Sequence, residues 1–190
     1  MRVVIAGAGS PLGDATAAAL REAGHEAIEV TRSVCDLTDF AAVQALAERL
    51  GPVDGVLHLV GGWRGGKGLA GQSDEDWEWL RARIVDTLRN TTRAFLPAIA
   101  ASPAGRFAIV SSTGVVAPTA SNANYVAAKA AAETWLLAVG QALSGTPASV
   151  HIERVTALFS DADRAAQPDR DWSKHTHVAE VARRFVSYWA

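Results

Sequence analysis

Short apolar runs alternate along the chain with longer segments in which apolar residues recur every three or four positions. The runs predict strands and the longer segments predict helices. Alternation of this kind is typical of a parallel sheet covered by helices on both faces. The six predicted strands are Arg2–Ala6, Glu26–Val30, a very short one near Val34, Gly55–Val60, Arg106–Ser111 and Ser149–Ala157. The five predicted helices are Leu12–Ala23, Asp39–Leu50, Asp74–Ala101, Asn122–Leu143 and His177–Trp189.

Polar residues and proline set the expected ends of these helices. Thr38 is the expected N-cap of the second helix, and Ser73 opens a weak capping box at the start of the third. Pro97 should kink the last turn of the third helix or end it. The chain of 190 residues shows no repeats and no linker, so residues 1–190 are expected to form a single α/β domain.

Composition excludes several classes of protein. Apolar residues make up 49% and charged residues 20%, which argues against a disordered chain. A formal charge of −2, without any basic run, argues against nucleic-acid binding. No stretch approaches the roughly 18 apolar residues of a membrane span. The single cysteine, Cys35, cannot form an internal disulfide, so we expect a cytoplasmic protein.

The first strand leads directly into a glycine-rich turn, Gly7-Ala8-Gly9-Ser10-Pro11-Leu12-Gly13, and then into a helix. Glycines let backbone N–H groups approach a pyrophosphate, and the helix N-terminus adds partial positive charge. The alternative is a tight turn that holds no ligand. The strand and helix on either side favour a dinucleotide site.

The second strand ends about 20 residues after the last glycine, where an NAD site places a carboxylate on the ribose. Here the sequence reads Thr31-Arg32-Ser33, without an acid. Arg32 offers donors that suit a 2′-phosphate, which favours NADP over NAD, although a solvated loop arginine is the alternative. Asp36 either faces the adenine or only caps the next turn.

Ser112, Tyr125 and Lys129 form the clearest catalytic pattern. Tyr125 and Lys129 are four residues apart on one helix and therefore share a face, while Ser112 ends the preceding strand. A phenol has an ordinary pKa of about 10, and a nearby ammonium could lower it for acid-base work. Ser112 would hold a substrate oxygen, and Tyr125 would exchange a proton with it.

These motifs resemble those of the short-chain dehydrogenase/reductase family across nearly the whole chain. The resemblance also includes Val53–Gly61, Asp76-Trp77 and Ser111-Ser112. It implies a Rossmann-type sheet of order 3-2-1-4-5-6, catalysis by Ser112, Tyr125 and Lys129, and homodimers or homotetramers paired through the third and fourth helices. The residues expected to bind the cofactor are Gly7, Gly9, Ser10, Pro11, Leu12, Gly13, Arg32, Ser33, Asp36, Leu37, Val60, Gly61, Gly62, Tyr125 and Lys129.

Four positions depart from the family pattern. Pro11 replaces a glycine of the turn, and His58-Leu59-Val60-Gly61 replaces Asn-Asn-Ala-Gly. The asparagine that completes the family's proton relay falls on Ile84. Ala157-Leu158 replaces the Pro-Gly that helps to seat the nicotinamide, and one helix follows without the usual seventh strand. Nucleotide binding is therefore a safer prediction than turnover.

Other conspicuous residues receive simpler interpretations. His175 and His177 lie near several aspartates, but we expect polar surface and no metal. His58 is expected to be a hydrogen-bonded core histidine rather than a base. Gly61–Gly68, which includes Trp63, is either a flexible loop or part of a ligand site. Ser160–Lys174 is either a flap over a site or a solvated connection. The aromatic residues expected in packing or subunit contacts are Trp77, Trp79, Trp135, Tyr188 and Trp189.

The sequence thus predicts an NADP(H)-dependent oxidoreductase acting on a small carbonyl or alcohol substrate that it does not identify. The alternative is a catalytically weak NADP(H)-binding sensor or partner protein with the same fold. A scaffold without nucleotide is less favoured, because it leaves the glycine turn, Arg32 and the Ser-Tyr-Lys set to coincidence.

Overall fold

The computed structural model describes residues 1–190 and is built on one sheet of five parallel strands. The strand order is β2-β1-β3-β4-β5, so the chain starts in the middle of the sheet and extends it first to one side and then to the other. The strands are β1 (Arg2–Ala6), β2 (Glu26–Val30), β3 (Gly55–His58), β4 (Arg106–Ser112) and β5 (Ser149–Val155).

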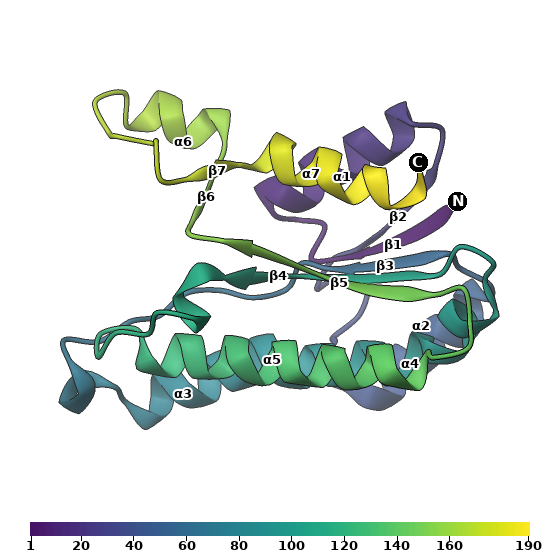
Figure 1. The fold of residues 1–190 in the computed structure, drawn as a ribbon, viewed down its shortest axis with the longest axis horizontal. Coiled ribbons are helices and arrows are strands. Elements are labelled where there is room, and N and C mark those ends of the chain that lie inside the picture. Colours follow the sequence, from purple (N-terminus) through teal and green to yellow (C-terminus); the bar gives the residue numbers. More distant parts are fainter.

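Helices cover both faces of the sheet, which gives three layers (Figure 1). On one face lie α1 (Pro11–Glu22) and α7 (Val178–Val186), which pack on each other. The other face carries α2 (Phe40–Leu50), α3 (Asp74–Leu80), α4 (Thr87–Ala101) and α5 (Ala123–Ala142). The shorter elements are η1 (Leu69–Gly71), η2 (Arg81–Asp86), η3 (Thr113–Val115), β6 (Leu158–Phe159), α6 (Asp161–Ala166), β7 (Thr176–His177) and η4 (Ser187–Trp189).

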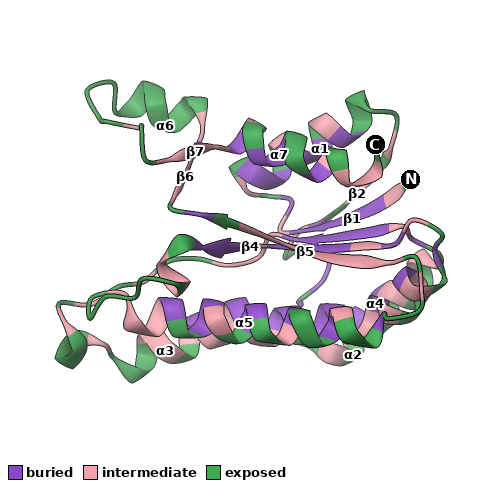
Figure 2. Cartoon of the chain, viewed as in Figure 1, coloured by how far each residue is buried: buried purple, intermediate pink, exposed green.

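Two hydrophobic cores lie on opposite faces of the sheet, because successive side chains of a strand point in opposite directions. In β1, Val4 and Ala6 pack with residues of α2, α4 and α5, while Val3 and Ile5 pack with α1 and α7. The helix faces that meet the sheet are buried and the opposite faces are exposed (Figure 2). The sheet is therefore a rigid base from which loops project at the carboxyl ends of the strands.

The predicted strand near Val34 is wrong, and the sheet accordingly has five strands instead of six. Val34 is 50% exposed, and its N–H bonds back to the carbonyl of Thr31 at 3.1 Å, so this segment turns instead of extending. A lone apolar residue among polar neighbours gives a strand no buried face. The order of the remaining five strands agrees with the sequence prediction.

The predicted helices are present, with changes at their ends and in the third. Asp39, not Thr38, is the N-cap of α2, and its carboxylate accepts from the N–H of Ala41 at 2.9 Å. The third predicted helix is α3 and α4 joined by η2, a π-helical segment. α4 continues for four residues after Pro97, to Ala101, so Pro97 does not end it.

The segment Ser160–Lys174 contains structure that hydrophobic periodicity did not indicate. Ser160 begins α6 with a complete capping box, and β6 pairs with β7 in a small parallel sheet. Phe159 stacks on Trp172, with ring centroids 4.8 Å apart. This aromatic contact folds the segment back toward β6, above the carboxyl end of β5 (Figure 1).

Candidate active site

A cleft of about 1370 Å³ lies at the carboxyl ends of the strands, where parallel sheets of this kind bind ligands. Of the residues predicted to bind cofactor or act in catalysis, all but Gly13 line it. Its walls come from the loops after β1, β2 and β3, the end of β4, the start of α5, and β6. One cavity thus collects side chains from most of the sequence.

The glycine-rich turn after β1 forms one end of the cleft. Gly7 has a φ of +97°, which favours glycine, and a Cβ there would come within 3.0 Å of the backbone of Leu59. A Cβ on Gly9 would meet only the Thr31 side chain, at 3.7 Å, so this glycine leaves space on the cleft side. Neither Gly9 nor Ser10 uses its backbone N–H in a hydrogen bond within the protein. These free donors beside a helix N-terminus suit an anionic group.

Ser10 and Pro11 fit the start of α1. The Ser10 hydroxyl donates to the carbonyl of Gly7 at 2.9 Å and accepts from the N–H of Gly13 at 3.1 Å, so it caps the helix. Pro11 is the first helical residue, where a missing N–H costs no hydrogen bond. The departure at Pro11 is therefore compatible with the turn. Gly13 lets the helix pack closely against the turn, because a Cβ there would lie 2.6 Å from backbone atoms of Gly7 and Ala8.

The loop after β2 forms the next part of the wall. Arg32 and Ser33 are exposed and line the cleft, and no salt bridge of the protein uses Arg32. The carboxylate of Asp36 accepts hydrogen bonds from the N–H and hydroxyl of Thr38, at 3.0 and 2.7 Å. These bonds hold the pKa of Asp36 below its ordinary value. Asp36 thus caps this turn while also lining the cleft.

Buried Asn90 of α4 fixes this loop, a contact that sequence reasoning missed. Its amide donates to the carbonyls of Leu37 and Thr38, both at 3.0 Å. The two segments are about fifty residues apart, and no local pattern relates them. Asn90 therefore positions the part of the wall that includes Leu37 and Asp36.

Ser112, Tyr125 and Lys129 come together on the opposite wall. Ser112 is the buried last residue of β4, while half-buried Tyr125 and buried Lys129 lie one turn apart on α5. The Ser112 hydroxyl accepts from the N–H of Gly114 at 3.1 Å. The Lys129 ammonium donates to the carbonyl of Val110 at 2.8 Å, and its Nζ lies 5.9 Å from the centre of the Tyr125 ring.

The pKa of Tyr125 differs from the expectation. Burial raises it above the ordinary value, and the Ser112 hydroxyl opposes that shift. The ammonium expected to lower it donates instead to the carbonyl of Val110, with its Nζ 5.9 Å from the centre of the Tyr125 ring. Burial also lowers the pKa of Lys129 to about 8. Tyr125 is accordingly protonated at neutral pH in this arrangement.

An ion pair between buried Glu133 and exposed Arg154 lies near Lys129, and sequence reasoning did not find it. Glu133, one turn along α5, accepts from Nε and Nη2 of Arg154 on β5 at 2.9 and 2.5 Å. Burial acts to raise the pKa of Glu133, but the paired guanidinium brings it below the ordinary value. The Glu133 carboxylate in turn opposes the effect of burial on Lys129. The spacing of four between Lys129 and Glu133 was the available signal.

The other departures from the family pattern occupy defined places. Ile84 is buried in the hydrophobic core within η2. His58 ends β3, is 3% exposed, and contacts Thr87 through Nε2 at 3.1 Å. Ala157 and Leu158 line the cleft where β5 passes into β6. The structure thus supplies no polar side chain at position 84.

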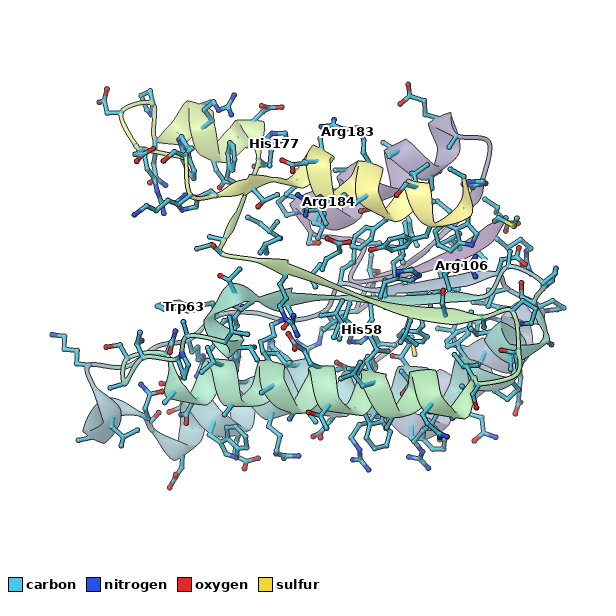
Figure 3. All side chains as sticks on the ribbon, in the orientation of Figure 1. His58, Trp63, Arg106, His177, Arg183 and Arg184 are labelled. Carbon is cyan, nitrogen blue, oxygen red and sulfur yellow. The ribbon has the colours of Figure 1, made fainter.

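Of the residues interpreted as surface or packing groups, some lie at the cleft and others contact neighbouring elements. Trp63 is 67% exposed and lines the mouth of the cleft (Figure 3). Trp135 donates from its ring N–H to Thr92 at 2.9 Å. His177 accepts from the N–H of Ala179 at 3.2 Å and so caps α7, while its Nε2 lies 3.3 Å from Asp161.

No helix is both long and apolar enough to cross a membrane.

Comparison with known proteins gives one family. A model of the short chain dehydrogenase family matches residues 1–166. None of the curated proteins matches the chain. The match includes the glycine turn, Arg32 and the Ser112, Tyr125 and Lys129 set, and it ends before β7 and α7.

Solved structures show the same fold at low sequence identity. ElxO, solved with NADP bound, has a TM-score of 0.85 at 12% identity, with 98% of this chain and 90% of that chain covered. A Mycobacterium ulcerans short-chain dehydrogenase/reductase has a TM-score of 0.85 at 16% identity, covering 100% and 82%. A short chain oxidoreductase from Pseudomonas aeruginosa PAO1 with an atypical catalytic center has a TM-score of 0.81 at 19% identity, covering 100% and 92%.

Proposed function

We propose, because the chain belongs to the short-chain dehydrogenase/reductase family, that it is an NADP(H)-dependent oxidoreductase that transfers a hydride between NADPH and a carbonyl or alcohol substrate. One observation carries the proposal. Ser112, Tyr125 and Lys129 line the same cleft as the glycine turn and Arg32, with which a dinucleotide would make contact along its length.

The residues present fit a dinucleotide with a 2′-phosphate. The free N–H groups of Gly9 and Ser10 would hold the diphosphate, and Arg32 with Ser33 would hold the 2′-phosphate. No carboxylate of the protein competes for Arg32 within salt-bridge distance. The bound nicotinamide would supply the hydride for reduction or accept it in oxidation.

Three side chains of the chain would handle the substrate oxygen. In reduction, the carbonyl carbon receives a hydride and the carbonyl oxygen receives the Tyr125 proton, giving an alcohol. The Ser112 hydroxyl would donate a hydrogen bond to that oxygen and so orient it. Lys129 would stabilise the resulting phenolate by its positive charge.

The raised pKa of Tyr125 favours the reduction direction. A protonated phenol is ready to donate to a carbonyl oxygen, whereas alcohol oxidation requires the phenolate first. The pKa of Lys129, about 8, keeps its ammonium mostly charged at neutral pH. The site is thus prepared as a proton donor beside a cation.

Calorimetric titration with NADPH and NADH, followed by a panel of carbonyl substrates, tests the proposal. We expect NADPH to bind more tightly than NADH, and at least one carbonyl to be reduced with NADPH consumption. Failure of either nucleotide to bind would overturn the proposal.

A second candidate is a sensor or partner protein that binds NADP(H) without efficient turnover. The observations that favour it are the apolar core position of Ile84 and the Lys129 ammonium bound to Val110. Under this alternative, NADPH binds tightly but no carbonyl in the panel is reduced. The titration and the panel therefore distinguish the two functions.

We also propose a homodimer or homotetramer formed through α5 and the continuous helical segment of α3, η2 and α4. Leu137, on α5, is 60% exposed, which leaves an apolar side chain on the outer face of that helix. Light scattering after size exclusion is expected to show a dimer or larger species for the wild type, and a smaller species for Leu137→Glu. A monomeric wild type would contradict this assembly.

A further inference from the structure

His58 is a buried histidine with only one of its two nitrogens in use. Its ring lies between the sheet and helix α5 (Figure 3), and the residue is 3% exposed. Nε2 lies 3.1 Å from the Thr87 hydroxyl, which itself donates to the carbonyl of Arg83 at 2.6 Å. Because the hydroxyl proton is engaged there, the ring donates from Nε2, and Nδ1 carries the free lone pair.

Nδ1 of His58 is buried and has no hydrogen-bond partner in the protein. A buried acceptor without a partner destabilises a fold, so such groups are usually satisfied by a protein group or by ordered water. An explanation for this nitrogen should therefore lie in its immediate surroundings.

His58 lines a small cavity of about 10 Å³ that Lys129 also lines. That volume is close to the minimum that holds one water molecule. The remaining lining residues are Val60, Ile84, Leu88, Ile109, Val110 and Ala132. An apolar cavity stays dry, but two of the residues that line this one carry an unpaired buried acceptor and an ammonium.

Lys129 has donors left for such a water. An ammonium has three N–H donors, and one is used by the carbonyl of Val110 at 2.8 Å. The neutral His58 ring accepts at Nδ1, and the nearby ammonium helps to keep it neutral. A water between the two would accept from Lys129 and donate to His58, which satisfies both groups.

We propose that the small cavity holds one ordered water that joins Lys129 Nζ to His58 Nδ1, and that His58 is a positioning residue that acts on Lys129 through this water. The inference deepens the proposed function, on which its catalytic meaning rests. His58 of β3 would support Lys129 in place of the asparagine that the family has at position 84. The apolar Ile84 forms part of the cavity wall.

Besides the Val110 carbonyl of β4, the titratable and charged groups that act on Lys129 come from three elements. Tyr125 and Glu133 lie on its own helix, Arg154 of β5 pairs with Glu133, and His58 of β3 faces it across the cavity. Only His58 approaches through the proposed water. Changing His58 should therefore leave the Glu133–Arg154 pair intact while removing one acceptor that stabilises the charged lysine.

The test measures the pKa of Lys129 by NMR of labelled lysine side chains in the cofactor-free protein. We expect His58→Leu to lower that pKa by about one unit, the size of one lost hydrogen bond to the charged form. His58→Gln keeps a polar side chain at this position, so it should lower the pKa of Lys129 by less than His58→Leu does. Ile109→Val, which enlarges the same cavity but keeps both polar groups, should leave the pKa unchanged.

A high-resolution crystal structure of the wild-type protein should show the water within hydrogen-bond distance of both nitrogens, and it does not depend on whether a variant folds. A dry cavity, or an equal Lys129 pKa in wild type and His58→Leu, would overturn the inference. If the enzyme is active, the basic limb of its kcat–pH profile should shift in His58→Leu together with the pKa of Lys129. If no carbonyl is turned over, the proposed function fails, while the crystal structure and titration still decide on the water.

Discussion

Arg32 is the residue on which the proposed preference for NADPH depends. Its guanidinium is exposed at the end of β2, free of salt bridges, and lines the cleft beside Ser33. A charge-assisted hydrogen bond to phosphate contributes about 1.5–3 kcal/mol, whereas a ribose hydroxyl offers no such charge. Discrimination between the two nucleotides should therefore follow this one side chain.

Arg32→Ala is expected to weaken NADPH binding by about tenfold to a hundredfold, while NADH affinity changes little. Calorimetric titration of both nucleotides measures the two dissociation constants. Arg93→Ala, which removes an arginine stacked on Phe40 away from the cleft, is the matched control. Equal losses for NADPH and NADH would show that Arg32 does not contact the 2′-phosphate.

Contacts between distant residues are what the sequence could not reveal at this scale. The spacing of Tyr125 and Lys129 follows from helical geometry and was readable directly. The bond from Asn90 to Leu37 and the pair of Glu133 with Arg154 depend on packing between separate elements. The raised pKa of Tyr125 likewise depends on burial, which single-residue chemistry does not predict.

At the scale of elements, hydrophobic patterns predicted the parts that pack on the sheet. The five strands were found because they are short apolar runs, and the helices α1, α2 and α7 because each presents a periodic apolar face to a core. The small sheet of β6 and β7 was missed, because two-residue strands have no period. The π-helical turn in η2 was missed because its hydrogen bonds leave no sequence signature.

The turn between β1 and α1 is the element whose geometry is most restricted. Gly13→Ala is expected to lower the free energy of unfolding by about 1–3 kcal/mol, because the new Cβ meets backbone atoms at 2.6 Å. NADPH affinity should fall with it, since the turn must shift. Urea denaturation and nucleotide titration measure the two effects.

Gly71→Ala provides the control for that substitution. Its Cβ would have no neighbour nearer than 3.7 Å, and its φ is not positive, so neither stability nor affinity should change appreciably. If Gly13→Ala proved as stable as Gly71→Ala, that result would contradict the close packing of helix and strand at this turn.

For the whole molecule, the buried His58 should make stability depend on pH in the acid range. Burial lowers its pKa from 6.5 to about 3, with Lys129 adding to the shift. Between these values the unfolded chain binds a proton that the folded protein does not. The free energy of unfolding should therefore fall as the pH drops from 6.5 toward 3, by up to about 1.4 kcal/mol per pH unit from this group.

Urea denaturation above pH 6.5 and midway between the two pKa values would measure this dependence. His58→Gln does not titrate, so its stability should fall less steeply with acid than that of the wild type. His25→Gln, which changes a histidine outside the core whose pKa is also lowered by burial, should reduce the slope less than His58→Gln does. Identical slopes in His58→Gln and wild type would place the acid sensitivity in other groups.

Tyr125 is the proposed proton donor in NADPH-dependent carbonyl reduction, and one comparison tests that role most directly. The steady-state rate of NADPH consumption should be measured for wild type, Tyr125→Phe and Tyr188→Phe with a carbonyl that the wild type reduces. We expect Tyr125→Phe to bind NADPH normally but to lose at least about a hundredfold in kcat, while Tyr188→Phe, the other tyrosine, stays active. Undiminished turnover by Tyr125→Phe would contradict the proposed mechanism.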